Sequence, residues 1–157
     1  MNEAIPISLN AARGILAVEC ALLELLSASE AASSCLRQAV AHVWSPGLRM
    51  IVDGRASEWA AAVLSLQALV AELGGIAEER QDAMPAPVDA LENATHAKVL
   101  ADCERAESAA LQVWAHALRK EIPREIRLRL AQQYVALWCG QGELRRWVGI
   151  RRGTSLP

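Results

Sequence analysis

Apolar residues recur at helical spacing over four long stretches of this chain, and the lengths of the connections between them restrict the topology. At about 100° per residue, the apolar side chains of each stretch fall on one face of a helix. We expect helices at about residues 8–43, 46–73, 95–121 and 123–150. Only a few residues separate the first two stretches, and likewise the last two. Each pair is therefore predicted to form an antiparallel hairpin.

The middle connection, residues 74–94, is of a different kind because the helical pattern disappears there. It holds the polar run 78–82, followed by Pro85 and Pro87. A helix of about 28 residues rises roughly 42 Å, and about 20 extended residues reach roughly 66 Å. The connection can therefore return along the whole bundle. The sequence predicts one all-α domain over residues 1–157, a ferritin-like antiparallel four-helix bundle with one long crossover between helices 2 and 3. The alternative is an up-down-up-down bundle, which needs only a short loop at this point.

Residues at the expected helix ends carry recognisable signals. Ser8 and Ser45 are predicted to be N-caps, and a proline follows Ser45 directly. Gly74 is predicted to end the second helix in the left-handed conformation. The tail from Arg151 onward is expected to lie outside the fourth helix. The pattern leaves open whether the first helix is continuous or breaks near residues 27–34.

Composition and charge exclude several classes of protein. The chain is 53% hydrophobic but only 4% aromatic, which is typical of closely packed helices rich in alanine and leucine. A formal net charge of -2 provides no field that would recruit nucleic acid or an anionic membrane. No basic segment followed by an apolar run opens the chain, so we expect a soluble, cytoplasmic protein. Its cysteines stand singly and are interpreted as buried thiols in a reducing compartment: Cys20, Cys35, Cys103 and Cys139.

Two stretches resemble a known family. Residues 55–75 read Arg-Ala-Ser-Glu-Trp and end in Leu-Gly-Gly, and residues 99–114 contain Cys-Glu-Arg-Ala-Glu-Ser-Ala-Ala. They are similar to the second and third helices of the DUF2383 group of bacterial ferritin-like four-helix-bundle proteins, whose third helix carries Cys-Glu-Arg-Gly-Glu-Asp-Ala-Ala. The chain departs from that pattern at residues 33–36, where the family has an acidic Gly-Tyr segment. The resemblance implies the fold and implies no particular reaction.

Glu107 is the most informative polar residue because it lies at the centre of an apolar helix face. Glu104 lies about one turn earlier at the edge of that face. A buried carboxylate requires a partner, a metal or a raised pKa. We therefore expect Glu107 to pair with a buried arginine such as Arg55 or Arg37, and the alternatives are a metal ligand and a solvated or interface position. The apolar face around Glu107 consists of Leu100, Cys103, Ala110, Leu111, Trp114 and Leu118.

The arrangement of carboxylates predicts at most a degenerate metal site. Di-iron bundles supply one Glu from each of two helices and a Glu-x-x-His pair from each of the others. No predicted helix of this chain contains Glu-x-x-His, and the fourth offers only Gln133 at a core-facing position. We therefore expect no cofactor, with iron or manganese as the alternative. The candidate metal ligands are Glu19, Glu30, Glu104 and Glu107, with Glu58 a further carboxylate on the second helix.

These observations favour a non-enzymatic interaction or structural protein over an enzyme. Trp138 and Trp147 add apolar surface to the fourth helix, so a homodimer is expected, together with a protein partner that the sequence does not identify. We expect no nucleic acid and no membrane as a partner. The alternative is an atypical carboxylate-bridged metal protein that handles iron or acts as an oxidase. A third hypothesis is a small-ligand pocket between the alanine- and serine-rich layers at residues 29–34.

Overall fold

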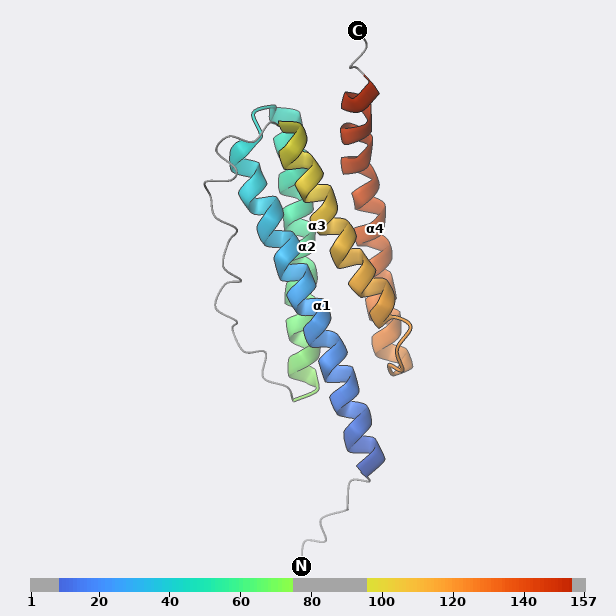
Figure 1. Ribbon diagram of the computed structural model, residues 1–157. Coiled ribbons are helices and arrows are strands. Elements are labelled where there is room, and N and C mark those ends of the chain that lie inside the picture. The colour runs from blue at the N-terminus through green and yellow to red at the C-terminus, as the bar shows by residue number, and fades with distance from the viewer. Residues whose placement is uncertain (1–8, 75–95, 154–157) are drawn as a thin grey trace, which may run out of the picture.

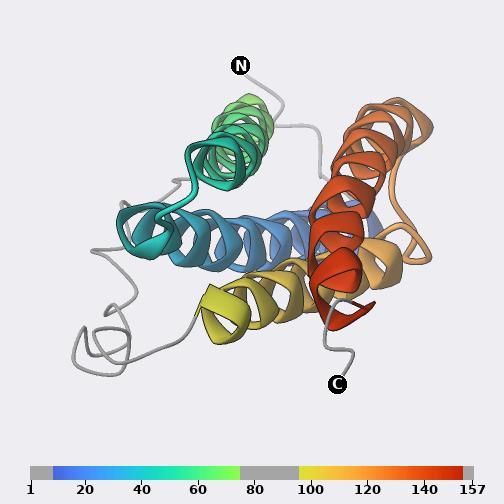
Figure 2. The ribbon, with the colours of Figure 1, turned by 90° about the horizontal axis from the view of Figure 1, so that it is seen from above.

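The protein is a bundle of α-helices, seen in a computed structural model that describes residues 9–74 and 96–153. Its helices are α1 (Leu9–His42), α2 (Pro46–Glu72), α3 (His96–Ala117) and α4 (Arg124–Gly153) (Figure 1). Both α1 and α4 pack against α2 and α3, so α1 lies diagonally opposite α4, and α2 opposite α3. Viewed along the bundle, α1 and α3 run side by side, with α2 and α4 on the other side (Figure 2). The all-α four-helix bundle predicted from the sequence is thereby confirmed.

Contacts near the two ends of the bundle fix the direction of each helix. The Trp44 backbone N–H, between α1 and α2, donates to Nε2 of His96 at 3.3 Å, so α3 begins where α1 ends. Near the other end, Arg129 of α4 forms an ion pair with Glu72 of α2 at 2.8 Å. The chain therefore leaves α2 at one end and enters α3 at the opposite end, as in the one-crossover topology and unlike the up-down-up-down alternative. The expected crossover itself lies outside the described residues, apart from Gly74.

The helix ends agree with the sequence at some positions and differ at others. Gly74 has a φ of +76°, the left-handed conformation predicted for it. Ser45 is the N-cap residue of α2, as predicted, and has the extended backbone of that position, but its side chain makes no cap hydrogen bond. The proline after it does occupy the first turn of α2. The open question about the first helix is answered, because α1 is continuous from Leu9 to His42, while Ser8 lies outside the described residues.

Two boundaries were predicted wrongly. α3 ends at Ala117, short of the expected residue 121. The N–H groups of Arg119 and Lys120 bind carbonyls three residues back, at 3.1 and 3.0 Å, which tightens the last turn and terminates the helix ahead of Pro123. α4 continues to Gly153, past Arg151, where the tail was expected to begin.

The core is built from leucine, alanine and valine, with two fully buried tryptophans, Trp59 and Trp114. The Trp114 indole N–H donates to the hydroxyl of Ser29 at 3.1 Å, and that hydroxyl donates to the Leu25 carbonyl at 2.7 Å. Ser33 is also buried, and its hydroxyl donates to the Ala56 carbonyl of α2 at 3.4 Å. An indole ring therefore occupies the space beside Ser29, in the layer that was expected to leave room for a ligand.

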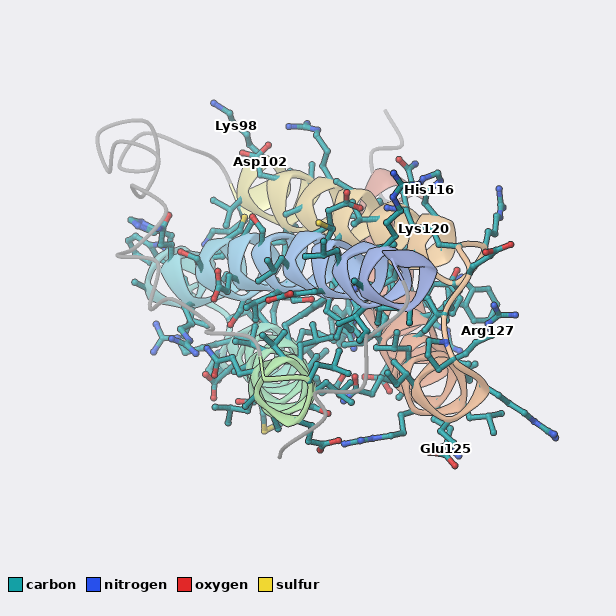
Figure 3. The ribbon with its side chains drawn as sticks, turned by 90° about the horizontal axis from the view of Figure 1, so that it is seen from below. Lys98, Asp102, His116, Lys120, Glu125 and Arg127 are labelled. Carbon is teal, nitrogen blue, oxygen red and sulfur yellow. The ribbon has the colours of Figure 1, made fainter. Side chains whose placement is uncertain are left out.

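Charged side chains lie mainly on the outside of the bundle. Lys98 and Asp102 lie on the outward side of α3 (Figure 3). Lys120, just beyond the end of α3, forms an ion pair with Glu24 of α1 at 2.7 Å. Within the described ranges, no helix combines the length and the apolar character that a membrane span requires.

Candidate functional site

A buried ion pair between Arg55 of α2 and Glu107 of α3 lies in the interior of the bundle. Arg55 is 2% exposed and Glu107 is fully buried. The arginine Nε donates to Oε1 of Glu107 at 2.7 Å, and Nη2 lies 2.6 Å from the same oxygen. The expectation that Glu107 pairs with a buried arginine is therefore confirmed for Arg55. Arg37, the other arginine considered, is exposed.

The same guanidinium group also contacts α4 and its own helix. Its Nη2 donates to the backbone carbonyl of Leu137 in α4 at 2.9 Å, and its Nη1 donates to Oε2 of Glu58. α2 and α3 lie diagonally opposite each other in the bundle. The Arg55–Glu107 pair therefore spans the interior of the bundle instead of joining two adjacent helices. One side chain thus connects three of the helices.

Gly140 makes room for this guanidinium group on α4. A Cβ atom at Gly140 would lie 2.7 Å from the Arg55 Cζ and 2.8 Å from Oε2 of Glu58, distances at which atoms overlap. Any side chain at residue 140 would therefore displace Arg55. The sequence signal for this role is a glycine within a helical pattern, which marks close packing, but the pattern does not show what the glycine faces.

The two carboxylate oxygens of Glu107 differ in their hydrogen bonding. Oε1 accepts from Arg55 and also from the indole Nε1 of Trp59, the latter at 2.8 Å. Oε2 is buried and has no hydrogen-bond partner among the described residues. Removing one member of such a pair leaves an uncompensated buried charge, at a cost of about 3–5 kcal/mol, whereas replacing both members with apolar residues is often neutral. The pair therefore restricts how the helices fit together more than it adds to stability.

A second polar group joins α3 to α4 nearer the surface. The side-chain amide of Gln141, which is buried, donates to the Ser108 hydroxyl at 2.7 Å. Arg145 donates to the same hydroxyl at 3.3 Å and to Oε1 of Glu104 at 3.2 Å. Glu104 and Glu107 lie one turn apart on α3, yet each has a different arginine as its partner.

The candidate metal ligands are not brought together. Glu19 and Glu30 are half-buried on α1 and lie about 16 Å apart along that helix. Ser29, next to Glu30, contacts Trp114, which is about 10 Å along α3 from Glu107. In residues 9–74 and 96–153, no three histidine, cysteine or acidic side chains gather as a metal site would require. Gln133 does face the core, and its Oε1 is buried without a partner in the same part of the chain.

The cysteines differ from the expectation of four separate buried thiols. Cys103 is buried, Cys35 is half-buried, and Cys20 and Cys139 are exposed. Cys35 of α1 and Cys103 of α3 influence each other's protonation. Interaction with the Cys103 thiol lowers the pKa of Cys35. Interaction with the Cys35 thiol, together with burial, raises the pKa of Cys103. Sequence reasoning missed this pair because apolar spacing places each thiol on its own helix without showing which helix faces meet.

Comparisons with known proteins identify no relative of this chain. A scan against models of protein families finds no match to this chain, and a search of curated proteins finds none either.

Proposed function

We propose that this protein is a non-enzymatic interaction or structural protein of the ferritin-like DUF2383 type, in which an internal arginine takes the position of a metal centre. One observation carries the proposal: the guanidinium group of Arg55 binds Glu107, the one buried carboxylate among the described residues. The proposal places the protein in the cytoplasm, where its cysteines remain thiols.

The electrostatics of Glu107 support this choice over metal chemistry. Arginine stays protonated under all physiological conditions, so a metal ion at Glu107 would lie beside a permanent positive charge. A metal ion at Oε1 would also have to displace two N–H donors, one from Arg55 and one from Trp59. The other candidate carboxylate on α3, Glu104, is bound to Arg145. The free Oε2 is the feature that favours the alternative, a metal-binding protein, and it makes Glu107 the residue to test.

The Glu107→Gln substitution distinguishes the two functions. It preserves the shape of the side chain and removes its charge, so Arg55 is left buried with only Glu58 as a charged neighbour. We expect a lower free energy of unfolding and the same metal content, measured by mass spectrometry on protein grown with iron and manganese and purified without chelator. Glu143→Gln, which changes an exposed carboxylate on α4 outside the set of candidate ligands, is the control and should alter neither quantity.

About two equivalents of transition metal in the wild-type protein, lost in Glu107→Gln, would overturn the proposal and establish the metal-binding alternative. Metal well below one equivalent in both proteins, with destabilisation confined to Glu107→Gln, supports the interaction or structural function.

We further propose that the outer face of α4 holds a second copy of the chain in a homodimer. Leu128, Val135 and Trp138 are 55%, 55% and 58% exposed, and their spacing of seven and three residues places them on one side of the helix. Trp147 extends the exposed apolar surface toward the end of α4, at 40% exposure. Exposed apolar surface of this kind is typical of self-association.

Light scattering on the wild-type protein and on Trp138→Glu tests this proposal. We expect a dimer that dissociates in the variant. Leu64→Glu, on the outer side of α2 at 67% exposure, is the matched control and should leave the dimer intact. A wild-type protein that remains a monomer at all concentrations would overturn the homodimer.

A further inference from the structure

Cys35 and Cys103 form a thiol pair where α1 and α3 pack together. Two contacts bracket the pair: Ser29 with Trp114 on one side, and the Trp44 backbone with His96 on the other. In the sequence, Cys35 lies between Ser29 and Trp44. Cys103 lies between His96 and Trp114. The helices run in opposite directions in this region, so the two thiols meet at the same level of the bundle. The mutual effect of the two thiols on their pKa values agrees with that placement.

The two thiols are not equivalent. Cys35 is half-buried whereas Cys103 is fully buried, so Cys35 is the more exposed of the two residues. Interaction with the Cys103 thiol lowers the pKa of Cys35, which increases its thiolate fraction. The pKa of Cys103 is raised by the same interaction and by burial, so this thiol stays protonated until its neighbour reacts.

We propose that Cys35 and Cys103 are a redox modification site at which a peroxide forms a reversible disulfide between α1 and α3. The Cys35 thiolate attacks one peroxide oxygen, the O–O bond breaks, and the second oxygen leaves as hydroxide and is protonated to water. Cys35 is then a sulfenic acid. The Cys103 sulfur, losing its proton, attacks the Cys35 sulfur, and the S–O bond breaks to release a second water. The two thiols lose two electrons and two protons in total, and one peroxide is reduced to two waters.

The geometry of the bundle suits this bond. A disulfide requires Cβ atoms that approach within about 4.5 Å, and the two thiols lie at the same level of two helices that pack directly against each other. Cys103 lies one turn before Glu107 on the same face of α3, so the disulfide would join α1 to the helix that holds the buried ion pair. The inference does not depend on the proposed function, because it rests on thiols that the ion pair does not use.

Peptide mapping after oxidation tests the proposal. The full-length reduced protein is treated with hydrogen peroxide, the remaining thiols are alkylated, and the disulfides are identified by mass spectrometry. In the native protein, we expect the Cys35–Cys103 disulfide to be the dominant intramolecular product. The same protein unfolded in guanidinium should give a mixture that also involves Cys20 and Cys139. A native protein that oxidises only at Cys20 and Cys139 would overturn the proposal.

Substitutions then assign the roles of the two thiols. The double substitution Cys20→Ser and Cys139→Ser removes only exposed thiols, so it should retain the fold and form the disulfide at the wild-type rate. Cys103→Ser should accumulate the sulfenic acid on Cys35, which dimedone traps, whereas Cys35→Ser should leave Cys103 unlabelled. Labelling of Cys103 in Cys35→Ser at the rate seen for Cys35 would overturn the assignment of Cys35 as the attacking thiol. Thiol reagents such as dithiothreitol should restore the reduced wild-type protein, and a disulfide that resists them when the protein is native would contradict reversibility.

Discussion

Gly140 and Gly142 occupy the same helix two residues apart, and replacing each by alanine should change stability in opposite directions. A Cβ at Gly142 meets nothing within 4 Å, whereas a Cβ at Gly140 would overlap the guanidinium group of Arg55. In an open helical position, alanine is favoured over glycine by about 1 kcal/mol. Gly142→Ala is therefore expected to raise the free energy of unfolding by about 0.5–1 kcal/mol.

The expected loss at Gly140 follows from the contacts of Arg55. If the guanidinium group moves only far enough to lose its hydrogen bond to the Leu137 carbonyl, the cost is about 1.5–3 kcal/mol. If it also leaves Glu107, a broken buried ion pair costs about 3–5 kcal/mol. After subtraction of the helix-propensity gain of about 1 kcal/mol, Gly140→Ala should destabilise the protein by about 0.5–4 kcal/mol. For a domain of this size, each 1 kcal/mol corresponds to about 2–4 °C in Tm.

Denaturant unfolding followed by circular dichroism measures both variants against the wild type. The midpoints should move in opposite directions, with the dependence on denaturant concentration unchanged. The cause is tested by repeating Gly140→Ala in an Arg55→Met background, where the penalty should disappear because the overlapping group is gone. The reasoning would be refuted if Gly140→Ala stabilised the wild type, or if its penalty persisted in the Arg55→Met background.

Three other predictions concern contacts elsewhere in the bundle. The double substitution Arg55→Met with Glu107→Leu should be less destabilising by about 2 kcal/mol or more than the sum of the single substitutions, because the double variant leaves no buried charge unpaired; simple additivity in denaturant unfolding would contradict this. Trp114→Phe should lower the free energy of unfolding by about 2 kcal/mol, since it removes a buried hydrogen bond to α1 together with ring volume, and a change below about 0.5 kcal/mol would argue against that contact. The hydrogen bond and charge of Arg129 lower the pKa of Glu72, so this pair contributes above the ordinary carboxyl pKa and its contribution is lost as pH falls through the lowered pKa. NMR titration should show the Glu72 pKa rising in Arg129→Gln, and an unchanged pKa would show that the pair does not form in solution.

The sequence predicts the helices well because burial of an apolar face imposes a period that can be recognised in the chain. The boundaries at Gly74 and Pro46 follow from the backbone preferences of these residues. The end of α3 does not, because it depends on two backbone hydrogen bonds in the turn after Ala117 that no residue type specifies. Ser45 is a similar case, since a residue suited to capping has the right backbone without making the side-chain bond.

Part of the candidate site was also predictable from the apolar face of a helix. A carboxylate in the middle of an apolar face must find a counter-charge, and this requirement identified Glu107 and included Arg55 among its partners. The contributions of Trp59 and Gly140 depend on the rotation of α2 and α4 about their own axes. Periodicity assigns each residue to a face but does not fix which faces meet. The contact between Cys35 and α3 was missed for this reason.

The diagonal ion pair also bears on how the two hairpins recognise each other during folding. Arg55 and Glu107 are 52 residues apart in sequence and belong to different hairpins, so their contact forms only after the hairpins dock. A bundle docked in the reverse orientation would bury a cation in one place and an anion in another, at a penalty of several kcal/mol. Leucine and alanine layers alone discriminate weakly between such arrangements, because either orientation buries apolar surface. The pair thus gives the correctly assembled bundle an energetic advantage over its end-over-end counterpart.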